Sequence, residues 1–119
     1  MMPGMMTRVL TLAAVLAATT SAPAFAEATS FTLANGTSAN MSAVSIRRSG
    51  TEGWKPLGVS PNAGARGAVT FSDPDCAFDI QASLAGGGTQ VWSGINLCEA
   101  KVVTLNRNDS GSNWVDYDD

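Results

Sequence analysis

The chain has 119 residues, of which 45% are hydrophobic, with seven basic and ten acidic side chains and no histidine. A sequence without histidine cannot form a Ser-His-Asp or Cys-His nucleophile, or the usual zinc and copper sites. The net charge of −3 lacks the clustered positive field that nucleic acid or an anionic lipid surface requires, so we expect neither as a partner.

Residues 1–26 have the pattern of a cleavable signal peptide. Arg8 precedes the apolar run Val9–Ala18, which is too short to cross a bilayer, and Ala24–Ala26 (AFA) supplies an A-x-A cleavage site. A buried helix or a membrane anchor is the alternative for this segment. We expect a periplasmic or secreted protein in which residues 27–119 form one domain, with no stable membrane anchor after cleavage.

Period-two alternation predominates after the signal, and helical periodicity is nearly absent. A bulge is predicted near Val44, where the alternation shifts. The pattern predicts strands at Ser30–Asn35, Met41–Arg48, Thr51–Pro56 (an edge strand or loop), Arg66–Phe71, Cys76–Leu84, Thr89–Cys98, Lys101–Asn106 and Asn113–Tyr117. About seven short strands at this spacing indicate an all-β fold, a small antiparallel sandwich or barrel.

The register of the central hairpin is predicted from its apolar positions. These pair Phe78 with Leu97, Ile80 with Ile95 and Leu84 with Val91, and place Trp92 on the face opposite Ile95. Gly87-Gly88 is then a two-residue loop of the type I′ turn, which needs positive φ. This register puts Cys76 and Cys98 on opposite faces, so we expect a bulge or strand end close to Cys98 that brings them together.

Cys76 and Cys98 are the chain's two cysteines, and both follow the predicted signal. An even pair in a small exported domain is most simply one disulfide. Closing a loop of this length stabilises the fold by roughly 3 kcal/mol. The alternatives are a redox pair, which usually has two residues between its cysteines, and a metal pair, which needs further ligands.

Catalytic patterns are weak in this sequence. Two carboxylates for glycoside hydrolysis could come from Asp73, Asp75, Asp79 or Glu99, although Asp73 and Asp75 flank a proline in a turn. Neither Lys55 nor Lys101 lies in an S-x-x-K motif. The acidic residues Asp109, Asp116, Asp118 and Asp119 lack calcium-loop spacing. We therefore expect no catalytic residues, no metal site and no cofactor, with a small carboxylate-based hydrolase as the alternative.

Large aromatic side chains are the best candidates for a binding surface. Trp54, Trp92 and Trp114 are the candidate ligand-facing residues, and Tyr117 lies close to Trp114. A covered Trp92 that fills the core is favoured over an exposed one, whereas exposed rings would indicate a glycan or protein partner. The expected role is therefore non-enzymatic binding or an envelope-associated function. A third hypothesis is a subunit that adds a strand to a partner through an unpaired edge.

Several short motifs run from Phe31 to Tyr117. They are FTLANGT, VSIRR, W-x-P-L, DCAFDI, W-x-G-x-N-L-C-E, VTLNR and WVDY. With these motifs the chain resembles small secreted two-cysteine proteins of Gram-negative bacteria that have no settled activity. The resemblance implies the fold and the paired cysteines only. Similar chains are sometimes labelled argininosuccinate lyase, but such a lyase is a large helical protein with a G-S-S-x-M-P loop, which this sequence lacks.

Overall fold

The computed structural model describes residues 26–119, so the predicted signal peptide lies outside the described residues except for Ala26. The described chain forms eight strands. They are β1 (Ala28–Asn35), β2 (Met41–Arg48), β3 (Lys55–Pro56), β4 (Arg66–Asp73), β5 (Ala77–Leu84), β6 (Gly88–Asn96), β7 (Val102–Arg107) and β8 (Asn113–Asp118). The predicted all-β fold is confirmed, and the stretch 51–56 contributes only the two-residue strand β3.

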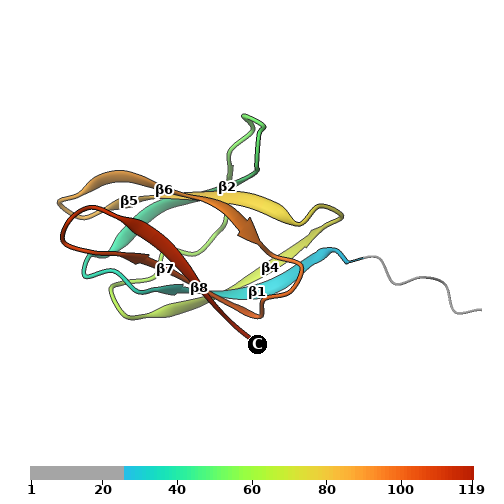
Figure 1. Ribbon diagram of the computed structural model, residues 1–119. Helices are drawn as coiled ribbons and strands as arrows, with labels where there is room; N and C mark the ends of the chain where they lie inside the picture. The colour runs from blue at the N-terminus through green and yellow to red at the C-terminus, as the bar shows by residue number, and fades with distance from the viewer. Residues whose placement is uncertain (1–25) are drawn as a thin grey trace, which may run out of the picture.

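The strands form two four-stranded sheets that face each other (Figure 1). One sheet has the order β4-β1-β7-β8 and the other β3-β2-β5-β6. All neighbours are antiparallel except β1 and β7, which run parallel with Thr32 opposite Val102. The expectation of an entirely antiparallel module is therefore wrong at one pair. Local alternation predicts strands but carries no information about which distant strand becomes a neighbour.

The bulge predicted near Val44 is present. The pairing of β2 with β5 shifts between Ser42 and Ser45, and Ala43 has a φ of +50°. The extra residue places Met41, Val44 and Ile46 on the buried side of the strand, although their spacing departs from strict alternation.

The predicted hairpin register is wrong. Phe78 pairs with Ile95, Ile80 with Trp92 and Leu84 with Gly88, and the loop is Ala85–Gly87 rather than Gly87-Gly88. The pairing shifts where Gly94 adopts a φ of +67°, because Ser93 and Gly94 together face Asp79 alone. This bulge turns both Trp92 and Ile95 inward and leaves Val91 on the surface.

The disulfide between Cys76 and Cys98 is confirmed. The two Cα atoms lie 5.1 Å apart, within the usual range for a disulfide. Strand β6 ends at Asn96, so Cys98 lies in the turn that follows, and the Leu97 N–H donates to the Cys76 carbonyl oxygen (2.9 Å). Of the two arrangements expected near Cys98, a bulge or a strand end, the structure has the strand end, and this brings the two cysteines together.

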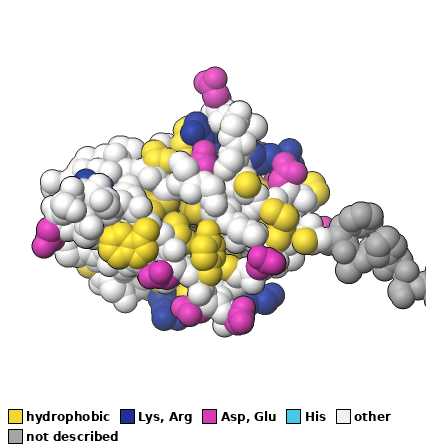
Figure 2. Space-filling view, in the orientation of Figure 1, with side chains coloured by type: hydrophobic (Ala, Val, Ile, Leu, Met, Phe, Trp, Pro, Cys, Tyr) yellow, Lys and Arg dark blue, Asp and Glu magenta, His cyan; other side chains and the backbone are white. Residues whose placement is uncertain are grey.

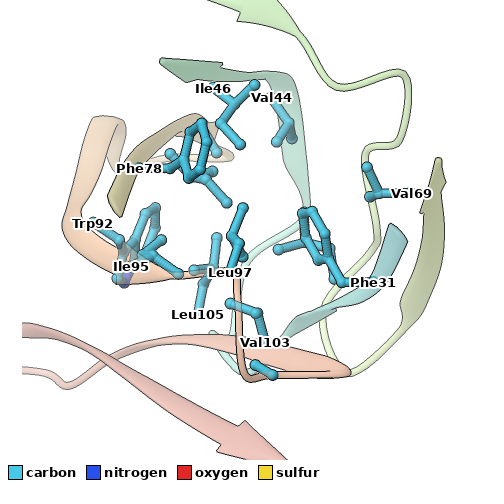
Figure 3. Packing of buried hydrophobic residues seen from close by; sticks show 14 of the residues in the cluster. Phe31, Val44, Ile46, Val69, Phe78, Trp92, Ile95, Leu97, Val103 and Leu105 are labelled. Atoms are coloured by element: carbon cyan, nitrogen blue, oxygen red, sulfur yellow. The ribbon is translucent and has the colours of Figure 1, made fainter. Parts of the chain in front are cut away.

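The core lies between the two sheets and draws on both of them (Figure 3). Phe31, Val103 and Leu105 come from one sheet, and Phe78 and Ile95 come from the other. Phe71 packs edge to face against Phe31 and Phe78, with ring centroids 6.0 and 5.2 Å away. Within residues 26–119 the chain has no helix long and apolar enough to span a membrane.

Candidate functional site: the groove between β6 and β8

Trp54 lies in the segment between β2 and β3, which projects from the sandwich (Figure 1). The guanidinium carbon of Arg47 lies 4.4 Å from the centroid of its ring, and the side chain is half-buried. This cation–π contact occupies one ring face of the first candidate tryptophan. A ligand that stacks on this face of the ring would have to displace Arg47.

Asp79 anchors the same arrangement from the neighbouring strand β5. Its carboxylate accepts hydrogen bonds from Arg47 Nε (2.9 Å), the Ser49 hydroxyl (2.8 Å) and the Gly94 N–H (3.0 Å). Burial alone would raise the pKa of Asp79, but these three donors lower it below its ordinary value. We call Arg47, Ser49, Trp54 and Asp79 the Arg47 cluster; within it every charge has a partner.

Arg48 points the other way along β2 and reaches the opposite sheet. Its guanidinium bonds to both carboxylate oxygens of Asp73 and lies 3.1 Å from Asp75 Oδ2. Burial raises the pKa of Asp73, but the Asp75 N–H and the Arg48 guanidinium together bring it below its ordinary value. The two neighbouring arginines therefore bind different carboxylates, one within a sheet and one between sheets.

Trp92 is removed from the ligand-facing candidates because only 2% of it is exposed. Its ring packs in the core, and its Nε1 donates to the Asn106 carbonyl oxygen across the sandwich (2.8 Å). The interpretation of this residue as core filler is confirmed. The expected placement opposite Ile95 is wrong, because the Gly94 bulge resets the alternation.

Trp114 and Tyr117 on β8 are each 45% exposed, and Val91 on β6 is 38% exposed. These three are the exposed large hydrophobic side chains of the described chain. A groove of about 440 Å³ lies between the two strands. It is lined by Val91, Trp92, Ser93, Asn113, Trp114, Val115 and Tyr117, and we call it the aromatic groove. In Figure 2 hydrophobic side chains gather on this face of the molecule.

Side-chain hydrogen bonds hold the two walls of the aromatic groove together. Asn113 Nδ2 donates to the Val91 carbonyl oxygen (3.0 Å), and the Tyr117 hydroxyl accepts from the Asn96 N–H (3.2 Å). Tyr117 pairs with the buried Val103, so its side chain lies on the inner face of β8. The Tyr117 ring is therefore held in place before any ligand arrives, which reduces the entropy cost of binding.

A second pocket of about 380 Å³ adjoins the aromatic groove at Tyr117. It is lined by Asn96, Glu99, Ala100, Tyr117, Asp118 and Asp119, and we call it the acidic pocket. Asn96 Nδ2 donates to Glu99 Oε2 (3.2 Å), and this hydrogen bond holds the Glu99 carboxylate against the end of β6. Acidic side chains lie around the hydrophobic patch in Figure 2.

The candidate catalytic carboxylates have structural partners. Asp73 and Asp79 bind arginines and have lowered pKa values, whereas a general acid needs a raised one. Asp75 shares Arg48 with Asp73, and Glu99 lies in a different pocket. Within the described residues, no group of three or more acidic or cysteine side chains is placed to hold a metal ion.

No protein-family model matches the chain, and no curated protein matches it. Among solved structures the chain is similar to an NMR structure of a protein from Eubacterium rectale. The identity is 16% and the TM-score 0.49, over 82% of this chain and 94% of that chain. Similarity at this level carries no inference about activity or ligand.

The structure thus separates the three candidate tryptophans. Trp54 is stacked on Arg47, Trp92 is in the core, and Trp114 is open to solvent. Val91 was expected in the core and instead lines the aromatic groove. Gly94 is the sequence signal that could have predicted the surface position of Val91, since a glycine inside an alternating strand often marks a bulge.

Proposed function

We propose that the protein is an exported, non-enzymatic binding module that recognises a glycan in the aromatic groove. The observation that carries the proposal is the pair of exposed rings, Trp114 and Tyr117, on the wall of a groove closed by side-chain hydrogen bonds. Aromatic rings offer flat apolar surfaces to a sugar ring, and the exposed side chain of Ser93 supplies a polar group for its hydroxyls.

A protein partner is less well supported by this surface. Three exposed large hydrophobic side chains form a small patch, whereas a stable protein interface buries about 800 Å² per partner. Strand addition to β6 is also hindered, because Asn113 and Tyr117 already bind the Val91 carbonyl and the Asn96 N–H. A pre-formed groove of a few hundred cubic ångströms suits a short oligosaccharide better.

Strand addition at β4 is the remaining interaction hypothesis. This eight-residue strand is the outer strand of its sheet, and its charges, Arg66 and Asp73, lie at its two ends. However, the pairing with β1 places Thr70 and Phe71 together opposite Ser30. A bulge in the middle of an edge strand disfavours pairing with another chain. The aromatic groove therefore remains the better supported surface.

The binding test uses three β-1,4-linked tetrasaccharides with the same connectivity: cellotetraose, the N-acetylglucosamine tetramer and the glucosamine tetramer. Titration of the isotope-labelled residues 27–119, with the disulfide oxidised, should shift amide signals of β6 and β8 and the Trp114 indole signal. Trp114→Ala should weaken binding by at least about tenfold, since stacked aromatic anchors dominate such sites. Trp54→Ala is the matched control and should bind normally.

The proposal fails if none of the three sugars shifts any signal at millimolar concentration. It also fails if the shifts map to Trp54 and the Arg47 cluster instead of the aromatic groove.

Export is supported by the signal-like pattern of residues 1–26 and by the disulfide, which forms in oxidising compartments. Expression of the full chain in a Gram-negative host, followed by fractionation and mass spectrometry, tests it. We expect periplasmic or extracellular protein that begins at Glu27 and has lost two thiol hydrogens. Full-length protein in the cytoplasm would contradict export.

A further inference from the structure

The carboxylates around the aromatic groove lack internal cations. Within the described chain, the ion pairs involve Asp73, Asp75 and Asp79 only. The other group of acidic residues lies on or beside β8, at Glu99, Asp116, Asp118 and Asp119. Three of them line the acidic pocket, and Asp116 accepts a neutral hydrogen bond from Asn106 Nδ2 (2.9 Å).

The basic residues at this end of the molecule do not neutralise these acids. Arg107 is engaged by the Gly111 carbonyl oxygen (2.8 Å) and by Asn113 Oδ1 (2.6 Å). Lys101 donates its backbone N–H to Asp118, but its side chain forms no ion pair within residues 26–119. Neither cation forms an ion pair with Glu99, Asp116, Asp118 or Asp119 within the described residues, and these four carboxylates outnumber the two cations, so the surface next to the exposed rings keeps a net negative charge.

The aromatic groove and the acidic pocket meet at one shared residue. Tyr117 lines both the aromatic groove and the acidic pocket, and its hydroxyl is held by the Asn96 N–H. A ligand stacked on Tyr117 would lie next to the acidic pocket, which Glu99, Asp118 and Asp119 line. Aromatic faces and nearby carboxylates both attract cations, so the two halves favour the same ligand chemistry.

We infer that the aromatic groove and the acidic pocket together select a glycan that carries a protonated amino group, with the sugar on Trp114 and Tyr117 and the ammonium among Glu99, Asp118 and Asp119. This inference rests on the proposed function and names the class of glycan. The positive charge of this glycan complements the carboxylates of the acidic pocket, and the apolar faces of its sugar rings complement Trp114 and Tyr117. An uncharged or acidic glycan would gain from the rings alone.

The test compares the glucosamine tetramer with the N-acetylglucosamine tetramer by calorimetry, at a pH where the free amines are protonated. The two have the same linkage and differ in charge. We expect the glucosamine tetramer to bind about tenfold more tightly at low salt, and the difference to shrink as added salt screens the exposed charges.

The variant D118N/D119N removes two carboxylates of the acidic pocket and should reduce the preference for the amino sugar by roughly five- to tenfold. The matched control is E52Q/D109N, which removes the same charge from exposed positions away from both pockets. It should leave the preference within about twofold of the parent. A third variant, Trp114→Ala, should weaken both sugars, which separates groove binding from nonspecific attraction to an acidic protein.

Each outcome decides between the two claims. Equal, Trp114-dependent affinities for both tetramers would overturn charge selection and leave the binding module intact. No binding of either tetramer or of cellotetraose would overturn the proposed function itself. A lysine tetrapeptide that binds more tightly than every sugar, and loses affinity in D118N/D119N, would overturn the glycan class in favour of a basic polypeptide.

Discussion

The Arg47 cluster can be compared with the aromatic groove and its neighbouring acidic pocket. Both arrangements combine an indole ring with carboxylates, and they differ in one respect. In the Arg47 cluster the chain supplies the cation, so the ring of Trp54 and the carboxylate of Asp79 are both satisfied. Around Trp114 no ion pair forms within the described residues. The first arrangement stabilises the fold, and in our proposal the second binds a ligand.

The disulfide between Cys76 and Cys98 lies beside the acidic pocket. Cys76 follows Asp75, a partner of Arg48, and Cys98 precedes Glu99 of the acidic pocket. We expect C76S/C98S to lose about 3 kcal/mol of unfolding free energy, because the unfolded chain is no longer constrained. Urea denaturation of the oxidised parent and the variant measures this. A loss below about 1 kcal/mol would mean that the turn after β6 is held without the disulfide.

Asp79→Ala should be the next largest change. It leaves the Arg47 guanidinium and the Gly94 N–H without their acceptor, which should cost roughly 2 to 3 kcal/mol. Asp109→Asn, at an exposed turn position, is the control and should be neutral within about 0.5 kcal/mol. A neutral Asp79→Ala would show that the Arg47 cluster does not stabilise the fold.

The same carboxylate should give the parent protein an acid-dependent stability. The folded-state pKa of Asp79 is below its ordinary value, so its contribution is present above about pH 4, the unfolded pKa, and is lost as the pH falls through the folded pKa. Urea midpoints at several acidic pH values should fall more steeply for the parent than for Asp79→Ala. Parallel curves would assign the acid sensitivity to other groups, such as Asp73.

Trp54→Ala should destabilise the protein by about 1 kcal/mol, because it removes the ring that stacks on Arg47. Sugar binding should remain unchanged. Thermal unfolding and calorimetry on the same preparation measure both quantities. Loss of binding without loss of stability would reverse the roles given to Trp54 and Trp114.

Trp114→Ala should change stability least, within about 0.5 kcal/mol, because the side chain is largely open to solvent. The expected loss of sugar affinity in this variant is therefore not a consequence of unfolding. If Trp114→Ala instead destabilised the protein by more than about 1 kcal/mol, its ring would be part of the fold.

The sequence predicted strand positions well and neighbours less well. The alternation of β5 and the shift near Val44 are local, and both appear where expected. The register of the hairpin depended on whether Gly94 interrupts β6, which alternation alone does not determine. The three candidate tryptophans could not be ranked by exposure from the sequence. Their exposure depends on residues distant in sequence, such as Arg47 beside Trp54 and Asn106 beside Trp92.

The parallel pairing of β1 and β7 has a consequence for the order in which the chain becomes folded. Strand β1 lies between β4 and β7, so the first strand to leave the ribosome is an interior strand of its sheet. It cannot complete its hydrogen bonding until the penultimate strand, β7, has also emerged, and such long-range pairing is slow. The β4-β1-β7-β8 sheet is therefore completed only after nearly the whole chain has been synthesised.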